Sequence, residues 1–132
     1  MRMKATAFRK ECENGGSLPR ILRRYTHSRL TQIAQGAACN RFHPIDARLA
    51  RWLLMTRDRM GTDEFRLTQE FLSNMLGVRR EGVNKAAGAL QQKHLISYSR
   101  GNLLILDRVR LKAIACHCYG IIKAEYDTFL PK

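Results

Sequence analysis

Four side chains that can hydrogen-bond to the edges of nucleic-acid bases lie within six residues of one another: Arg80, Glu81, Asn84 and Lys85. Arginine and lysine donate to O6 and N7 of guanine, glutamate accepts from N4 of cytosine, and asparagine pairs with adenine. The ordinary alternative is a solvated helix face, on which Glu81 and Lys85 form an i, i+4 ion pair worth a few tenths of a kcal/mol. The surrounding elements decide between these two interpretations.

The residues before this group predict two helices joined by a tight turn. Thr68 is a good N-cap for a first helix, which ends at Gly77 because glycine supplies the left-handed backbone of a helix C-terminus. A second helix, over about residues 79–93, follows the turn Gly77-Val78-Arg79. We expect the first helix to bury Phe71, Leu72, Met75 and Leu76. The second shows the i, i+3, i+4, i+7 spacing of one buried face at Val83, Ala86, Ala87 and Leu90.

Beyond the second helix the hydrophobic period changes to that of strands. Residues 95–99 and 103–106 flank Arg100-Gly101-Asn102, which is typical of a hairpin tip. Asp107 then caps one final helix, whose inward side carries Leu111, Ile114, Ala115, Cys118 and Ile122. The fold class is therefore predicted to be mainly α with a small β-hairpin wing, a winged helix-turn-helix. In this context the base-readout interpretation is favoured.

A long helix is predicted ahead of this unit. A short helix over 3–13 ends at Asn14-Gly15-Gly16, and a longer one begins with Ser17 as a cap. Its apolar stripe can pack on its own domain or on a second chain, and consists of Leu18, Leu22, Leu30, Ile33 and Ala37. At His43-Pro44 the chain restarts. The next helix, about 44–59, should bury Ile45, Leu49, Trp52 and Leu53, and residues 61–66 form a turn or short strand.

The stretches 68–72, 76–85 and 94–96 resemble the helix-turn-helix of the Crp/Fnr superfamily of bacterial regulators. Residues 48–54 look like that family's helix between its dimer helix and its DNA-binding domain, so the resemblance covers about 18–122. It implies an N-terminal helix from the end of a sensor domain (1–16), a dimerisation helix (17–42) and a DNA-binding domain (43–132). It also implies a homodimer that binds a palindromic operator.

The resemblance also assigns residues. The family's Arg-Glu-x-x-x-Arg pattern matches Arg80 to Lys85, with lysine in place of the last arginine, which removes its planar bidentate fork. Contacts to the DNA backbone are implied for Thr68, Gln69, Arg79, Gly82 and Arg100. The sensor β-roll that usually precedes the dimer helix has no counterpart here. We therefore expect no cyclic nucleotide and no other cofactor to bind this chain.

Composition agrees with a nucleic-acid partner. With 24 Lys+Arg against 11 Asp+Glu, the 132 residues carry a formal net charge of +13, which suits a polyanion. Double-stranded DNA is favoured over RNA as the partner, because a recognition helix fits the wide major groove, whereas RNA modules typically expose stacking aromatics. A membrane partner is not expected, since no uncharged stretch approaches about 20 residues. With no export signal, we expect a cytoplasmic protein with free thiols at its four cysteines.

Four other functions compete with this interpretation. A metal site at Cys116-His117-Cys118 is disfavoured, because residues two apart on a continuous helix point about 200° away from each other. An enzyme is not expected, since the four histidines are scattered without a partnered motif. An interaction protein that dimerises with a full-length relative, and a sequence-blind DNA-binding protein, remain as alternatives.

Overall fold

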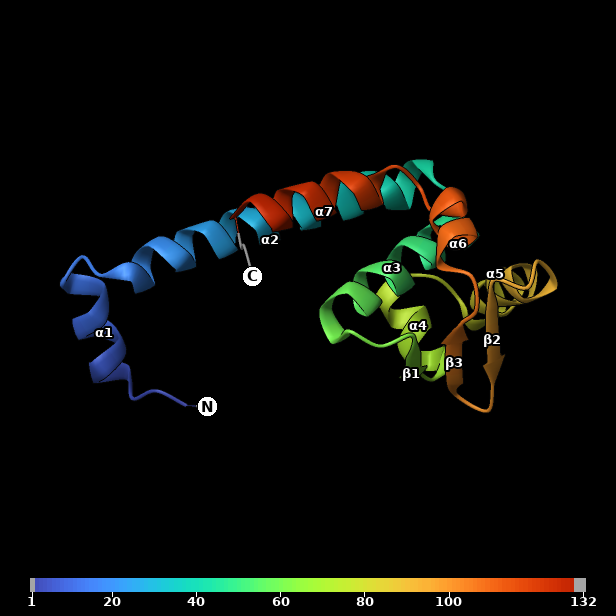
Figure 1. Ribbon diagram of the computed structural model, residues 1–132, viewed down its shortest axis with the longest axis horizontal. Helices are drawn as coiled ribbons and strands as arrows, with labels where there is room; N and C mark the ends of the chain where they lie inside the picture. The colour runs from blue at the N-terminus through green and yellow to red at the C-terminus, as the bar shows by residue number, and fades with distance from the viewer. Residues whose placement is uncertain (1, 130–132) are drawn as a thin grey trace.

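The computed structural model describes residues 2–129 and has a small helical domain at one end of a long helical arm (Figure 1). Seven helices and three short strands form within the described residues. The N-terminal appendage is α1 (Ala5–Glu13), and the arm is α2 (Ser17–Phe42). The remaining elements are α3 (Ile45–Met60), β1 (Glu64–Arg66), α4 (Gln69–Leu76), α5 (Arg80–Gln92), β2 (Ile96–Ser99), β3 (Asn102–Ile105), α6 (Arg108–Ile114) and α7 (Cys118–Phe129). The mainly α fold with a small β wing is confirmed.

The helix ends follow from local chemistry. The Thr68 hydroxyl accepts a hydrogen bond from the amide of Phe71 at 3.1 Å, and the Asp107 carboxylate accepts one from the amide of Arg110 at 2.9 Å. Both N-caps were predicted, and each satisfies an amide that has no partner inside its own helix. Ser17 differs, since it is the first residue of α2 and Gly16 occupies the cap position without a side-chain bond.

The wing belongs to a three-stranded antiparallel sheet with the order β1-β3-β2. The segment predicted as a turn or short strand supplies β1, which pairs with β3 so that Phe65 lies opposite Leu103. Strands β2 and β3 are joined by Arg100 and Gly101, whose φ angles are +48° and +82°. Positive φ at both central residues is the geometry of a type I′ turn, which matches the twist of the two strands.

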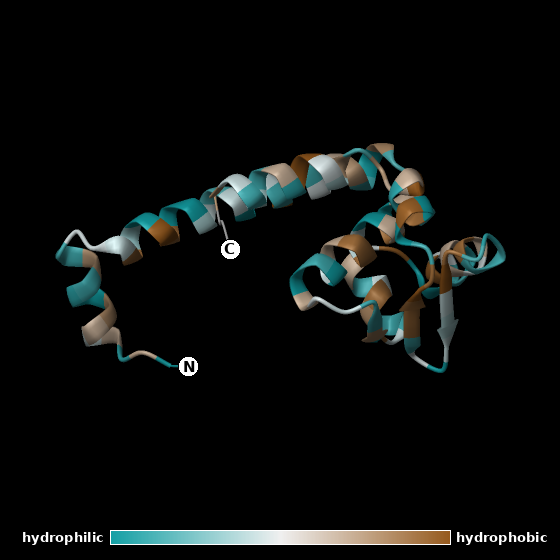
Figure 2. Cartoon of the chain, in the orientation of Figure 1, coloured by the Kyte–Doolittle hydropathy of each residue, from teal (hydrophilic) through white to brown (hydrophobic). Residues whose placement is uncertain are grey.

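Helix α3 lies at the centre of the domain, against α4, α5, α6 and α7. Apolar residues gather on the facing sides of these elements (Figure 2). Of the residues expected to be buried in α4, Leu72 and Leu76 are, but Phe71 and Met75 are 43% and 51% exposed. This prediction was wrong because α4 uses only one side against α3 and α5. Phe71 instead meets the half-buried Trp52 edge to face, with ring centroids 5.9 Å apart.

The predicted single C-terminal helix is also wrong, because the chain divides it into α6 and α7. Ala115 has the extended conformation φ −58°, ψ 142°, and α7 begins again with the amide of Tyr119 donating to the Cys116 carbonyl at 3.0 Å. The break lets α6 pack on α3 while α7 turns back along α2 (Figure 1). One straight helix cannot pack on both α3 and α2, because these two surfaces lie in different directions.

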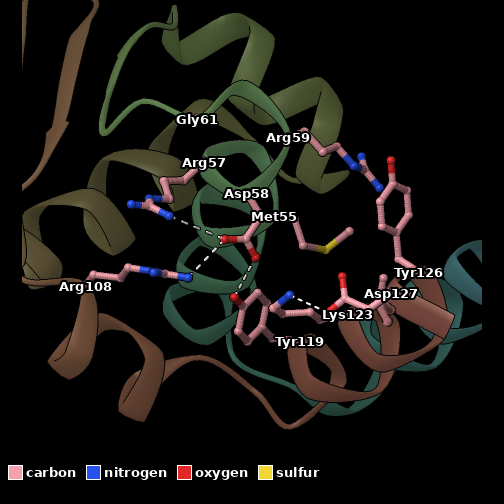
Figure 3. A pocket seen from close by; sticks show the side chains of 11 residues that line it. Met55, Arg57, Asp58, Arg59, Gly61, Arg108, Tyr119, Lys123, Tyr126 and Asp127 are labelled. Atoms are coloured by element: carbon pink, nitrogen blue, oxygen red, sulfur yellow. Dashed lines mark hydrogen bonds and ion pairs between the residues drawn. The ribbon is translucent and has the colours of Figure 1, made fainter. Parts of the chain in front are cut away.

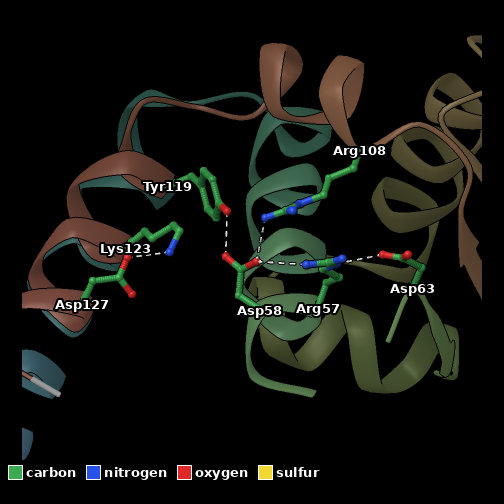
Figure 4. A network of polar contacts seen from close by, with 7 residues as sticks. All are labelled: Arg57, Asp58, Asp63, Arg108, Tyr119, Lys123 and Asp127. Atoms are coloured by element: carbon green, nitrogen blue, oxygen red, sulfur yellow. Dashed lines mark hydrogen bonds and ion pairs between the residues drawn. The ribbon is translucent and has the colours of Figure 1, made fainter. Parts of the chain in front are cut away.

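A polar network centred on Asp58 attaches α6 and α7 to the end of α3 (Figure 4). Its carboxylate accepts from the Tyr119 hydroxyl at 2.6 Å and from the Arg108 guanidinium at 3.1 Å. Burial and the hydrogen bond to Asp58 raise the pKa of Tyr119, so its hydroxyl stays a donor. Arg57 lies nearby and makes its main ion pair with Asp63, at 2.9 Å.

The same groups line a hollow of about 560 Å³ between α3 and α7 (Figure 3). Its basic side chains have partners within the chain. Lys123 pairs with Asp127 at 2.5 Å, and Arg59 donates to Gln32 and lies over the Tyr126 ring. The hollow is therefore built from internally satisfied contacts rather than from free charges.

Asp58→Ala should lower the free energy of unfolding by about 1–2 kcal/mol, because it leaves Tyr119 and Arg108 without their shared acceptor. The matched control is Asp127→Ala, which removes an exposed i, i+4 ion pair and should cost no more than about 0.5 kcal/mol. Urea denaturation followed by circular dichroism measures both. Equal losses in the two variants would show that the network does not hold α6 and α7.

Two glycines should respond in opposite directions to alanine. Gly77 has φ +63° and ends α4, whereas Gly88 lies inside α5, and a Cβ at either position meets no atom within 4 Å. Gly77→Ala should destabilise by about 1 kcal/mol through its left-handed backbone, and Gly88→Ala should stabilise by about 0.5–1 kcal/mol. Thermal unfolding gives both signs, and a stabilised Gly77→Ala chain would contradict this account of the turn.

Candidate nucleic-acid interface

Backbone hydrogen bonds and one buried arginine fix the turn between α4 and α5. Gly77 adopts the left-handed conformation and its amide donates to the Ser73 carbonyl, as does the amide of Val78 at 3.1 Å. From α3, the guanidinium of Arg48 donates to the Leu76 carbonyl at the end of α4. Arg48 is only 5% exposed. A buried cation thus satisfies the C-terminus of α4, where the helix dipole favours positive charge.

Helix α5 presents all the predicted base-reading side chains to solvent. Val83, Ala86, Ala87 and Leu90 are buried as predicted, and this fixes the rotation of the helix about its axis. Arg80, Glu81, Asn84 and Lys85 are all exposed. The structure makes no Glu81–Lys85 ion pair among its described residues. Arg80 instead pairs with Glu70 of α4 at 2.8 Å, with the two side chains 61% and 68% exposed.

An exposed pair of this kind is worth at most about 1 kcal/mol. Arg80 can therefore exchange Glu70 for a phosphate or a base at little cost. Glu70 lies in the first turn of α4. Its contact with Arg80 depends on how α4 and α5 cross, which no sequence spacing reports.

A shallow hollow of about 410 Å³ brings residues from three elements together. It lies between the N-terminus of α4, the start of α5 and the wing tip. Four of the residues predicted to contact DNA line it, together with three that were not so predicted: Thr68, Gln69, Arg80 and Arg100, with Glu70, Tyr98 and Gly101. The hollow thus brings together candidate residues that lie far apart along the chain.

The wing tip is bonded directly to the segment before α4. The amide of Leu67 donates to the Gly101 carbonyl at 2.7 Å, and the Tyr98 hydroxyl donates to the Leu67 carbonyl at 2.9 Å. Burial raises the pKa of Tyr98, which keeps this hydroxyl a donor. Tyr98 therefore holds the wing against the segment before α4.

Arg79 and Gly82 differ from each other in their surroundings. Arg79 occupies the N-cap of α5, and its exposed side chain makes no capping bond. Gly82 is half-buried, its amide donates to the Arg79 carbonyl at 2.9 Å, and a Cβ there would lie 3.2 Å from Ile45 Cδ1. The packing of α5 on α3 accounts for this glycine. Its contact with the DNA backbone stays a prediction.

The stripe predicted for dimerisation lies on the side of α2 away from α7. Ser28 and Cys39 are buried and lie within about 20° of each other around the helix, so they mark the α7 side. Leu30 and Ile33 lie about 160° and 140° from Ser28 around the helix and are 61% and 62% exposed. Ala37 is exposed too, while Leu18 and Leu22 are half-buried.

No helix within residues 2–129 is long and apolar enough to span a membrane.

Comparison with known proteins agrees with this architecture. A model of the Crp-like helix-turn-helix domain matches residues 47–114. No curated protein matches the sequence. A protein described as a Crp/Fnr-family transcriptional regulator from Eubacterium rectale has a TM-score of 0.62 at 24% identity, over 83% of this chain and 51% of that one.

Two Thermus thermophilus structures are also similar. The CRP-family regulator TTHB099 has a TM-score of 0.59 at 23% identity, over 86% of this chain and 55% of that one. The catabolite activator protein has a TM-score of 0.51 at 23% identity, over 71% and 44%. The chain thus spans about half the length of these proteins. At such identities they show the fold, and the matched domain, which covers half of the chain, shows that it belongs to the Crp-like helix-turn-helix family.

Proposed function

We propose that this chain is a transcription regulator that binds a specific, palindromic duplex DNA site as a homodimer. The observation that carries the proposal is the group of exposed base-reading side chains at the start of α5, beside the Arg100 wing tip. The N-terminal end of the second helix of such a motif is the part that enters the major groove. Arg80, Glu81, Asn84 and Lys85 would contact bases there.

The residues around the hollow would position the protein on the DNA backbone. Thr68 and Gln69 lie at the N-terminus of α4, where exposed amides and the helix dipole favour a phosphate. Arg79 and Arg100 add exposed positive charge near Arg80. Contacts of this kind carry no sequence information but fix the register of the recognition helix. The net charge of +13 would supply the long-range attraction.

Dimerisation through α2 would bring two such surfaces to one DNA duplex. The exposed stripe at Leu30, Ile33 and Ala37 runs along a helix of about 39 Å, given 1.5 Å per residue. Apolar side chains at this spacing pack well against a second copy of the same helix. We therefore propose residues 17–42 as the dimerisation helix and residues 43–132 as the DNA-binding part, with residues 1–16 as an N-terminal appendage.

Selection from a randomised duplex library followed by sequencing tests specific binding. The wild-type chain should enrich a palindrome with half-sites about 34 Å apart. Arg80→Ala and Glu81→Ala should each cost about 1–3 kcal/mol of specific binding and relax the preference at one position per half-site. Arg100→Ala should weaken binding to all sequences alike.

The matched control is Lys112→Ala, which removes the same charge from an exposed position on α6, away from the wing tip (Figure 1). It should leave the selected sequence unchanged. Binding that enriches no sequence and only fades with salt would mean that the positive charge acts alone. A dimer without DNA binding would instead favour an interaction protein that modulates a related regulator.

Ile33→Glu should convert the dimer into a monomer, because it places a charge in the proposed apolar contact. Ala38→Glu adds the same charge to the flank of α2, at an exposed position outside the stripe, and should remain dimeric. Sedimentation equilibrium at micromolar concentration distinguishes the two. If Ile33→Glu sediments like the wild-type chain, α2 does not form the dimer contact.

A further inference from the structure

Four side chains with metal-binding atoms converge where α2 ends. They are Cys39 near the end of α2, His43 at its C-cap, Cys116 between α6 and α7, and Cys118 at the start of α7. One possible ligand atom from each residue lies within 4.8 Å of every other. The three cysteines are 0%, 8% and 1% exposed, and His43 is half-buried. The cluster shares no residue with the hollow at the start of α5 and takes no part in the proposed DNA contacts.

The distances between the ligand atoms are close to the edges of a tetrahedron around one ion. Cys39 Sγ and Cys116 Sγ are 3.4 Å apart, and Cys118 Sγ lies 3.5 Å from His43 Nδ1. A tetrahedral zinc site with Zn–S about 2.3 Å and Zn–N about 2.0 Å has S···S edges of about 3.8 Å and S···N edges of about 3.6 Å. Four ligand atoms this close leave space for a single ion, whereas an iron–sulfur cluster would hold them further apart.

The break between α6 and α7 is what makes the cluster possible. On one continuous helix Cys116 and Cys118 would point away from each other, and on this ground the sequence disfavoured a metal site. Cys116 lies outside both helices in this structure, so both thiols reach the same point. Cys39 and His43 are four residues apart and leave the same side of α2.

A side-chain amide lies beside the cysteine cluster. The Gln35 amide donates to Cys118 Sγ at 3.6 Å, as partners of metal ligands commonly do. A coordinated cation deprotonates thiols, so the three buried cysteines would bind the ion as thiolates.

We propose that Cys39, His43, Cys116 and Cys118 bind one Zn²⁺ ion. On binding, three thiols release three protons to solvent and the imidazole coordinates in its neutral form, so the centre carries a net charge of −1. A Cys39–Cys116 disulfide is the competing use of these residues. It requires the sulfur atoms to close from 3.4 Å to about 2.05 Å, and it leaves the approach of Cys118 and His43 without a role.

The ion joins the end of α2 to the start of α7, and through His43 it lies beside the first turn of α3. It therefore fixes the direction in which the arm leaves the DNA-binding part of the chain. If α2 is the dimerisation helix, an inference that rests on the proposed function, the ion also sets the separation of the two recognition helices. Zinc binding itself does not depend on that function.

Zinc content and ligand type can be measured on the reduced wild-type chain. Native mass spectrometry after dialysis should find about one zinc ion per chain, and zinc K-edge X-ray absorption should report three sulfur and one nitrogen ligand. Replacement by Co²⁺ should give thiolate charge-transfer and intense tetrahedral d–d absorption. One equivalent of Zn²⁺ should raise the unfolding midpoint by at least about 5 °C. A chain that holds no zinc, or zinc with fewer than three sulfur ligands, would overturn the proposal.

Variants locate the site. Cys118→Ser and His43→Asn should each lose at least about tenfold in zinc affinity, measured by competition with a chromophoric chelator. The matched control is Cys12→Ser, the one cysteine outside the cluster, which should bind zinc like the wild-type chain. An unchanged affinity in Cys118→Ser would refute the ligand set. The wild-type spectra decide the question if a variant does not fold.

Library selection repeated with and without a zinc chelator separates the two proposals. One zinc ion per chain without any sequence preference would refute the proposed function and leave the metal site intact. If a chain that takes up no zinc still selects a palindrome, the metal site is refuted and the proposed function stands. If both hold, chelation should reduce affinity for the palindrome more than affinity for a single half-site, since only the palindrome needs a fixed spacing between recognition helices.

Discussion

The burial of helix α3 is the interaction on which the other elements depend. Leu49, Ala50, Leu53 and Leu54 are completely buried, and the helix contacts α4, α5, α6 and α7. Each fully buried leucine contributes roughly 1.5–3 kcal/mol relative to an exposed one. Because the other helices meet on α3 and not on each other alone, its position determines the crossing angles of the whole domain.

The polar side chains of α3 hydrogen-bond to specific points on the neighbouring helices. Arg48 satisfies the end of α4 immediately before the turn, and Asp58, near the end of α3, holds α6 and α7. Hydrogen bonds of this kind contribute modestly to net stability, but breaking them leaves buried groups without partners. The apolar face of α3 thus assembles the domain, while its polar residues fix where the recognition helix begins and where the C-terminal helices turn.

The recognition surface and the cysteine cluster share no residues, and they differ in character. Arg80 and Arg100 are held by backbone geometry and by bonds from the wing to Leu67, with side chains left in solvent. Cys39, Cys116 and Cys118 are the reverse, being buried between α2 and α7. Exposed polar groups are suited to a large, water-covered partner such as DNA, whereas buried thiols are suited to an ion that replaces solvent.

The sequence by itself determined the features that depend on short-range periodicity and turn chemistry. Thr68, Gly77 and Asp107 fixed helix ends through hydrogen bonds within a few residues, and the stripe from Val83 to Leu90 fixed which side of α5 faces out. The resemblance carried by residues 68–85 then pointed to the family. These features can be predicted from the sequence because the groups that produce them are close along the chain.

Only the tertiary structure decided the contacts between distant segments. The exposure of Phe71 and Met75, the Arg80–Glu70 pair, the buried Arg48 and the meeting of Cys39 with Cys116 all depend on how helices cross. The division of the last helix at Ala115 is of the same kind, since no proline or glycine marks it in the sequence. It forms because α6 packs on α3 and α7 packs on α2, and those two surfaces acquire their directions only once the chain has folded.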